Sequence, residues 1–152
     1  MNAEAARSVP ARSLPVQVSL LLAAAWGTVA ALKVGALDQL AAVLDAAMLF
    51  PPWLASPLAV ALVAWEAAVA LGLLIPIVRR AALWATAMTL LAYLGFAVWR
   101  AVAGIDAPCQ CFGPLLRSTP GASAAVCLVL LVPTILGLRA RCSASHQGEG
   151  NA

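Results

Sequence analysis

Residues 54–78 read LASPLAVALVAWEAAVALGLLIPIV, an apolar run of 25 residues in which Glu66 is the only charge. A helix that crosses the hydrocarbon core of a bilayer needs roughly 17 to 25 predominantly apolar residues. Lipid offers no partner for free backbone N–H and C=O groups, so such a run must satisfy them internally as a helix. This stretch therefore predicts a membrane-spanning helix.

Three further apolar runs have comparable lengths and cover residues 16–32, 81–103 and 122–138. The chain of 152 residues is 64% hydrophobic and only 10% charged, whereas a soluble domain carries about 25% charged residues. We therefore expect an all-α membrane protein, a bundle of four transmembrane helices in one domain over residues 14–139, with the lipid bilayer as its partner. The net charge of +3 is too small and dispersed to suggest nucleic acid.

Polar segments flank these runs. We expect residues 1–13 to form a short tail and residues 140–152 a disordered one. The first run could instead be a signal peptide, because it follows a basic segment and contains Ala23-Ala24-Ala25 as a cleavage site. However, the run stays apolar through Leu32, which favours a span.

The connections between the runs differ in length. Arg79 and Arg80 alone separate the second run from the third, which predicts a tight hairpin. The first connection contains residues 37–50, whose apolar positions have helical spacing, so we expect a short surface helix there. Small residues also recur every four positions, a spacing that lets helices approach closely in lipid. They are Gly27, Ala31 and Gly35 for the first run and Ala64, Ala68 and Gly72 for the second.

Basic residues predict the orientation, because they accumulate on the cytoplasmic side of membrane proteins. One side of the expected bundle carries Arg7, Arg12, Arg79, Arg80, Arg139 and Arg141. The other side carries Lys33, Arg100 and Arg117. We therefore expect both termini to be cytoplasmic and the connection over residues 104–121 to be extracytoplasmic, in the inner membrane of a bacterium.

That third connection contains Cys109 and Cys111, separated by Gln110. Cysteines this close can place their Cα atoms within the ~4.4 to 6.8 Å that a disulfide tolerates. The ring would be small and strained, and strained, exposed disulfides tend to be catalytic or regulatory. A redox pair is one interpretation; a structural staple of the loop, or two free thiols, is the other.

Other uses of these cysteines fit the sequence less well. A structural zinc ion needs about four nitrogen or sulfur ligands, and the single histidine, His146, is expected on the opposite face, so we expect no metal site. No cofactor is required by the spacing. A quinone pocket near Tyr93, Trp99 and the cysteine connection is compatible with the sequence, but no pattern demands it.

Glu66 is a second candidate site, because an ionised carboxylate near the centre of a span costs at least ~2.5 kcal/mol. Such residues are functional candidates by default. Lys33, at the end of the first span, and Arg100, at the end of the third, are the candidate partners. The alternative is a protonated Glu66 that only holds neighbouring helices together.

Three elements of the sequence resemble the methylamine utilisation protein MauE family, within the DoxX-like group. They are Leu32-Lys33, Trp65-Glu66 followed by Leu71-Gly72-Leu73-Leu74, and Cys109-Gln110-Cys111-Phe112-Gly113. The resemblance covers about residues 16–138. It implies a four-helix membrane protein of amine metabolism that helps a disulfide-rich methylamine dehydrogenase to mature. It also implies that Cys109 and Cys111 are the redox pair and that Lys33 and Glu66 are polar residues of the bundle.

We therefore expect a redox-associated membrane protein that exchanges disulfides with an extracytoplasmic thioredoxin-like or disulfide-rich protein, as a thiol–disulfide oxidoreductase or an accessory to one. Two alternatives remain at this level. The protein could be a non-enzymatic assembly or scaffold subunit whose loop disulfide is structural, or a small-solute carrier that uses Glu66.

Overall fold

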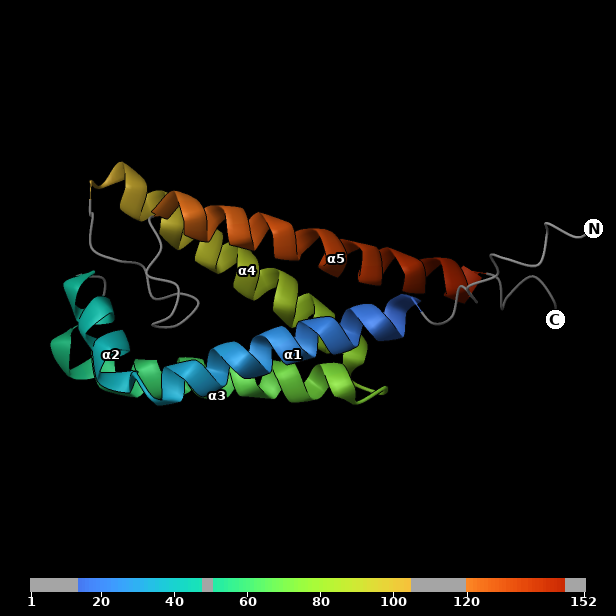
Figure 1. The fold of residues 1–152 in the computed structure, drawn as a ribbon, viewed down its shortest axis with the longest axis horizontal. Helices are drawn as coiled ribbons and strands as arrows, with labels where there is room; N and C mark the ends of the chain where they lie inside the picture. The colour runs from blue at the N-terminus through green and yellow to red at the C-terminus, as the bar shows by residue number, and fades with distance from the viewer. Residues whose placement is uncertain (1–13, 48–50, 105–119, 147–152) are drawn as a thin grey trace, which may run out of the picture.

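The computed structural model describes residues 14–47, 51–104 and 120–146, and these residues form five helices (Figure 1). The helices are α1 (Leu14–Val34), α2 (Leu37–Ala46), α3 (Pro52–Leu74), α4 (Arg79–Val102) and α5 (Pro120–His146). Side chains are described for residues 16–47, 51–104 and 121–139.

Four of these helices are long and apolar enough to cross a membrane, over Val16–Val34, Pro52–Leu74, Arg79–Val102 and Gly121–Arg139. The predicted fold class is therefore confirmed: an all-helical chain with four candidate spans and a short helix, α2, between the first and second. The protein is a multi-pass membrane protein.

The boundaries of the second and third spans differ from the expected ones. Helix α3 ends at Leu74, four residues before the predicted end, and Ile75 is extended with φ −87° and ψ 116°. A residue that precedes a proline is pushed out of the helical region, and Pro76 has this effect on Ile75. The connection is consequently residues 75–78, and the expectation of a hairpin made by Arg79 and Arg80 alone was wrong: both belong to α4.

The C-terminal boundary also differs, because α5 continues to His146. The segment that we expected to be disordered from residue 140 is thus helical at its start.

The helices pack mainly in two pairs, α1 with α3 and α4 with α5, and contacts of α3 with α4 and of α1 with α5 join the pairs. The end of α1, helix α2, the end of α4 and the start of α5 all lie at one end of the molecule (Figure 1). Helix α2 packs against the first half of α3, where its buried Leu40 contacts a cluster containing Ala59 and Val63.

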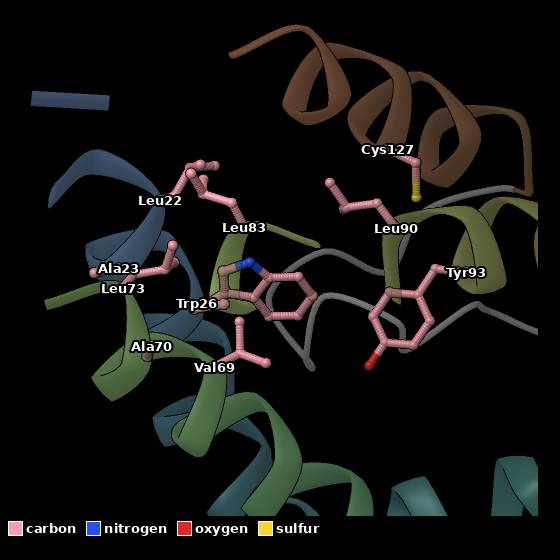
Figure 2. Packing of buried hydrophobic residues seen from close by; sticks show 11 residues of the cluster. Leu22, Ala23, Trp26, Val69, Ala70, Leu73, Leu83, Leu90, Tyr93 and Cys127 are labelled. Atoms are coloured by element: carbon pink, nitrogen blue, oxygen red, sulfur yellow. The ribbon is translucent and has the colours of Figure 1, made fainter. Parts of the chain in front are cut away.

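The main apolar core draws on all four long helices. It contains Leu22, Ala23, Trp26, Val69, Ala70, Leu73, Ala82, Leu83, Leu90, Tyr93 and Cys127. Trp26 projects from α1 toward Val69 and Tyr93 (Figure 2), and its ring centroid lies 6.3 Å from that of Tyr93. Helices in lipid gain no hydrophobic driving force from association, so this dense packing is itself a source of stability.

Close approach of α3 and α4 confirms the small-residue hypothesis at one position. A Cβ added to Gly72 would lie 3.1 Å from the Cβ of Ala82, so a larger residue at 72 would separate the helices. Gly27 in α1 has no atom within 4 Å of such a Cβ, and the hypothesis therefore fails there.

Arg79 is buried at the connection between α3 and α4. Its Nε donates a hydrogen bond to the carbonyl oxygen of Leu73 at 3.0 Å, and a terminal nitrogen donates to that of Leu74 at 3.4 Å. The last carbonyls of a helix lack intrahelical partners, so Arg79 closes the end of α3. Arg80 is exposed.

The different surroundings of these neighbouring arginines predict different effects of substitution. Arg79→Gln should lower the free energy of unfolding by about 1.5 to 3 kcal/mol, because it removes charge-assisted hydrogen bonds to buried carbonyls. Arg80→Gln is the matched control and should change it by less than about 0.5 kcal/mol. Thermal unfolding of both purified variants measures the difference, and equal effects would contradict the capping role of Arg79.

Candidate functional site

Three polar side chains from three helices meet inside the bundle. Lys33 comes from the last turn of α1, Glu66 from the middle of α3 and Tyr93 from α4. Their exposed fractions are 1%, 0% and 8%, so they are enclosed by protein. The structure therefore brings together the two intramembrane residues that the sequence singled out and adds a tyrosine.

One carboxylate oxygen is the centre of this network. Glu66 Oε1 accepts hydrogen bonds from Lys33 Nζ and from the hydroxyl of Tyr93, and Lys33 and Glu66 form an ion pair. Lys33 Nζ also lies 3.2 Å from the Tyr93 hydroxyl oxygen and 5.0 Å from the centroid of its ring. The ammonium group is thus stabilised by the carboxylate, the hydroxyl oxygen and the aromatic face.

The lengths of the helices explain how a lysine at the end of one span reaches a glutamate in the middle of another. Glu66 lies 14 residues after Pro52 in α3, about 21 Å along the axis. Ala30 of α1 packs in one cluster with Ala59 and Val63 of α3, so α1 continues past the level of Glu66 before α2 packs beside the earlier part of α3. Side chains of a helix lean toward its N-terminus, and the Lys33 side chain reaches back in this direction to Glu66. Of the two partners considered for Glu66, Lys33 makes the ion pair.

The second carboxylate oxygen has a different environment. Glu66 Oε2 is buried and has no hydrogen-bond partner among the residues that the structure describes. Buried polar atoms without a partner are rare in folded proteins. This oxygen can therefore accept a further hydrogen bond, from a water molecule or from a hydroxyl or amine group, without disturbing Lys33 or Tyr93.

A second polar link between α3 and α4 lies next to Glu66. Trp65 Nε1 donates to the hydroxyl oxygen of Thr89 at 2.9 Å, and Thr89 donates to the carbonyl oxygen of Ala85. Trp65 is half exposed, whereas Thr89 is buried. Successive residues of α3 thus bind α4, Trp65 from the outer face and Glu66 from the interior.

Sequence reasoning did not identify Tyr93 as the third member of the network. Tyr93 was noted only as part of a possible quinone pocket with Trp99 and the cysteine connection, and that pocket stays an untested alternative because the connection lies outside the described residues. The signal that could have found it is simple: Tyr93 is the only tyrosine of the chain and lies inside an apolar run. A buried tyrosine hydroxyl usually has a hydrogen-bond partner.

The cysteines separate into two groups. Cys109 and Cys111 lie outside the described residues, so their roles stay predictions. Cys127 is fully buried in the main apolar core, where it packs as a small residue (Figure 2). The chain on either side of the cysteine pair leaves the bundle at the end of α4 and returns at the start of α5.

Comparison with known protein families decides the affiliation. The sequence model of the family 'Methylamine utilisation protein MauE' matches residues 11–140, which is most of the chain. The chain belongs to the MauE family. No curated protein and no solved structure matches it. The resemblance derived from the sequence is therefore confirmed, and this MauE protein is a membrane protein of methylamine utilisation.

The match includes every residue of the candidate site. It covers Lys33, Glu66 and Tyr93 as well as Cys109 and Cys111, so the buried network and the cysteine pair lie within one family domain. The match by itself assigns no role to any of these residues.

The buried network predicts a large effect of removing its central charge. Glu66→Gln leaves the Lys33 ammonium without a counter-ion inside the bundle, and breaking a buried pair in this way costs about 3 to 5 kcal/mol. Thr89→Val is the matched control, because it removes one polar link between the same two helices. An interhelical hydrogen bond in a membrane contributes about 0.6 kcal/mol on average.

Chemical or thermal unfolding of the purified variants gives the ranking. We expect Glu66→Gln to be far less stable than Thr89→Val. If the two variants have the same unfolding free energy, the ion pair does not hold the bundle together.

Proposed function

We propose that this MauE protein supports thiol–disulfide exchange with an extracytoplasmic redox protein through Cys109 and Cys111, and so assists maturation of a disulfide-rich enzyme of amine oxidation. The observation that carries the proposal is the spacing of the two cysteines, with one residue between them, in the connection between α4 and α5. Membership of a methylamine utilisation family supports the link to amine oxidation.

The exchange can be written as a balanced reaction. A thiolate of the partner attacks one sulfur of a Cys109–Cys111 disulfide and forms a mixed disulfide, releasing the other cysteine as a thiolate. A second thiolate of the partner then attacks the mixed disulfide. The partner gains a disulfide and loses two electrons, while both MauE cysteines become reduced. A membrane quinone or another disulfide protein would take these two electrons in the next cycle.

Compartment matters for this chemistry, because disulfides persist in oxidising surroundings outside the cytoplasm. The distribution of basic residues supports an extracytoplasmic position of the connection between α4 and α5, with both termini in the cytoplasm. The end of the bundle that carries this connection is also the end at which α1 finishes and α2 lies (Figure 1).

In this proposal Lys33, Glu66 and Tyr93 are positioning residues. They join α1, α3 and α4 with polar contacts that lipid cannot replace. Helix α4 leads directly into the cysteine connection, so an α4 held firmly in the bundle gives the cysteines a fixed base. Exchange reactions depend on access of the attacking thiolate to the disulfide, and a fixed base favours such access.

A non-enzymatic assembly subunit is the second candidate function. The closed ion pair favours it, since three side chains that bind one another stabilise the bundle without any turnover. In that case a disulfide between Cys109 and Cys111 would only staple the connection.

The topology predicts a labelling pattern in intact cells. We expect a membrane-impermeant maleimide, after mild reduction, to label a variant that retains only Cys109 or only Cys111. A variant that retains only Cys142 is the control and should be labelled only after the cells are lysed. Labelling of Cys142 but not of Cys109 and Cys111 in intact cells would overturn the proposed function.

Trapping of a mixed disulfide distinguishes the proposed exchange reaction from the non-enzymatic assembly function. One of the two variants Cys109→Ser and Cys111→Ser should accumulate a mixed disulfide with the oxidised partner, visible as a thiol-sensitive band. The remaining thiolate attacks the disulfide of the partner in the reverse of the exchange, and the chain then lacks the second cysteine that would complete this reverse reaction. Cys127→Ser is the control and should behave as the wild type. If the double variant Cys109→Ser/Cys111→Ser leaves oxidation of the partner and maturation of the amine-oxidising enzyme unchanged, the assembly function is correct.

A further inference from the structure

The buried network has one hydrogen-bond donor and one acceptor that its own members do not use. An ammonium group carries three donor hydrogens, and Lys33 Nζ donates to Glu66 Oε1 and to the hydroxyl oxygen of Tyr93. Within the part of the chain that the structure describes, no side chain or carbonyl accepts the third hydrogen. Glu66 Oε2 likewise receives no donor there. One hydrogen of Lys33 and one oxygen of Glu66 are thus available to a ligand.

These two groups belong to the same ion pair and are neighbours. Both oxygens of a carboxylate are bonded to one carbon, so Oε2 lies close to the ammonium group that binds Oε1. A single atom that accepts a hydrogen bond from Lys33 and donates one to Glu66 would therefore satisfy both groups. The aromatic face of Tyr93, 5.0 Å from Nζ, attracts the positive charge but cannot donate a hydrogen bond to Oε2.

The charge of the network indicates that such a ligand is neutral. Lys33 and Glu66 already neutralise each other, and Tyr93 contributes a hydroxyl group. A further cation or anion would be buried in the bundle without a counter-ion, which is costly inside a bilayer. Amines in their charged form and carboxylates are therefore disfavoured as ligands.

Enclosure of the network indicates that the ligand is small. Val63, Val69 and Ala70, one turn of α3 on either side of Glu66, are buried like Glu66 itself. The hydroxyl of Tyr93 points away from Cys127 and the apolar side of the core (Figure 2). Water is the smallest neutral molecule that accepts and donates through one atom, and buried waters typically make about three hydrogen bonds to polar groups.

We propose that one water molecule bridges Lys33 Nζ and Glu66 Oε2 inside the bundle. An ion pair that leaves water loses the hydration of both ions, and the bridging water restores a part of it for each. It also adds a second link between α1 and α3 beside the direct ion pair. This water site is independent of any chemistry at Cys109 and Cys111.

Solid-state NMR of the full chain in lipid bilayers tests the proposal, with magnetisation transferred from water protons. Lys33 is the only lysine of the chain, so ¹⁵N-lysine labelling gives a single Nζ signal. With ¹³C-glutamate labelling, the carboxyl signal that disappears in Glu66→Gln belongs to Glu66. We expect transfer from water to both Lys33 Nζ and Glu66 Cδ. Absence of transfer to these atoms in the wild type would overturn the proposal.

Lys33→Arg tests the bridging position, because a guanidinium group binds both oxygens of a carboxylate with two parallel hydrogen bonds. It should displace the water and abolish transfer from water to Glu66 Cδ. Arg80→Lys is the matched control, since it exchanges the same two residue types at an exposed position, and it should leave the transfer unchanged.

Unfolding temperatures show whether each variant is folded. Undiminished transfer from water to Glu66 in folded Lys33→Arg would overturn the proposal, and so would transfer from lipid protons in place of water. The wild-type measurement tests the proposal by itself if Lys33→Arg does not fold.

Discussion

The ion pair between Lys33 and Glu66 is the constraint on which the rest of the structure depends. A single unpaired charge inside a bilayer costs at least ~2.5 kcal/mol, and both groups are fully enclosed. The chain can therefore bury Glu66 only if α1 brings Lys33 to the same depth. Tyr93 adds a hydrogen bond from α4 to the same oxygen, so one carboxylate fixes three helices relative to one another.

This constraint also shapes the end of the bundle from which the cysteine connection leaves. After α1 ends at Val34, α2 packs beside the first half of α3. Tyr93 holds α4 in the same network nine residues before its last residue, Val102. The polar network thus lies deeper in the bundle than the end of α4, from which the chain continues to Cys109 and Cys111. A fixed bundle at this end is compatible with the exchange proposed for Cys109 and Cys111.

Much of this architecture was predictable from the sequence. A long apolar run must form a helix in lipid, and a charge inside such a helix needs a partner. The four spans, the short helix after the first one and the pairing of Glu66 with one of two cations all follow from the sequence. The end of α3 was missed because the effect of Pro76 on Ile75 outweighs the hydropathy of residues 75–78. The role of Tyr93 was missed because α3 and α4 are apolar on most faces, and their rotation depends on packing rather than on a visible stripe. Gly72 against Ala82 shows how a single small contact sets that packing.

The central claim is that the attraction between opposite charges at positions 33 and 66 holds the bundle together. The most direct measurement is the unfolding free energy of the charge-swapped protein Lys33→Glu/Glu66→Lys beside its two single variants, all in lipid nanodiscs. Each single variant buries two like charges, so both should be strongly destabilised, and the double variant should recover a large part of the loss. If the double variant is as unstable as the sum of the two single variants, the pair makes no specific contribution and the account is wrong.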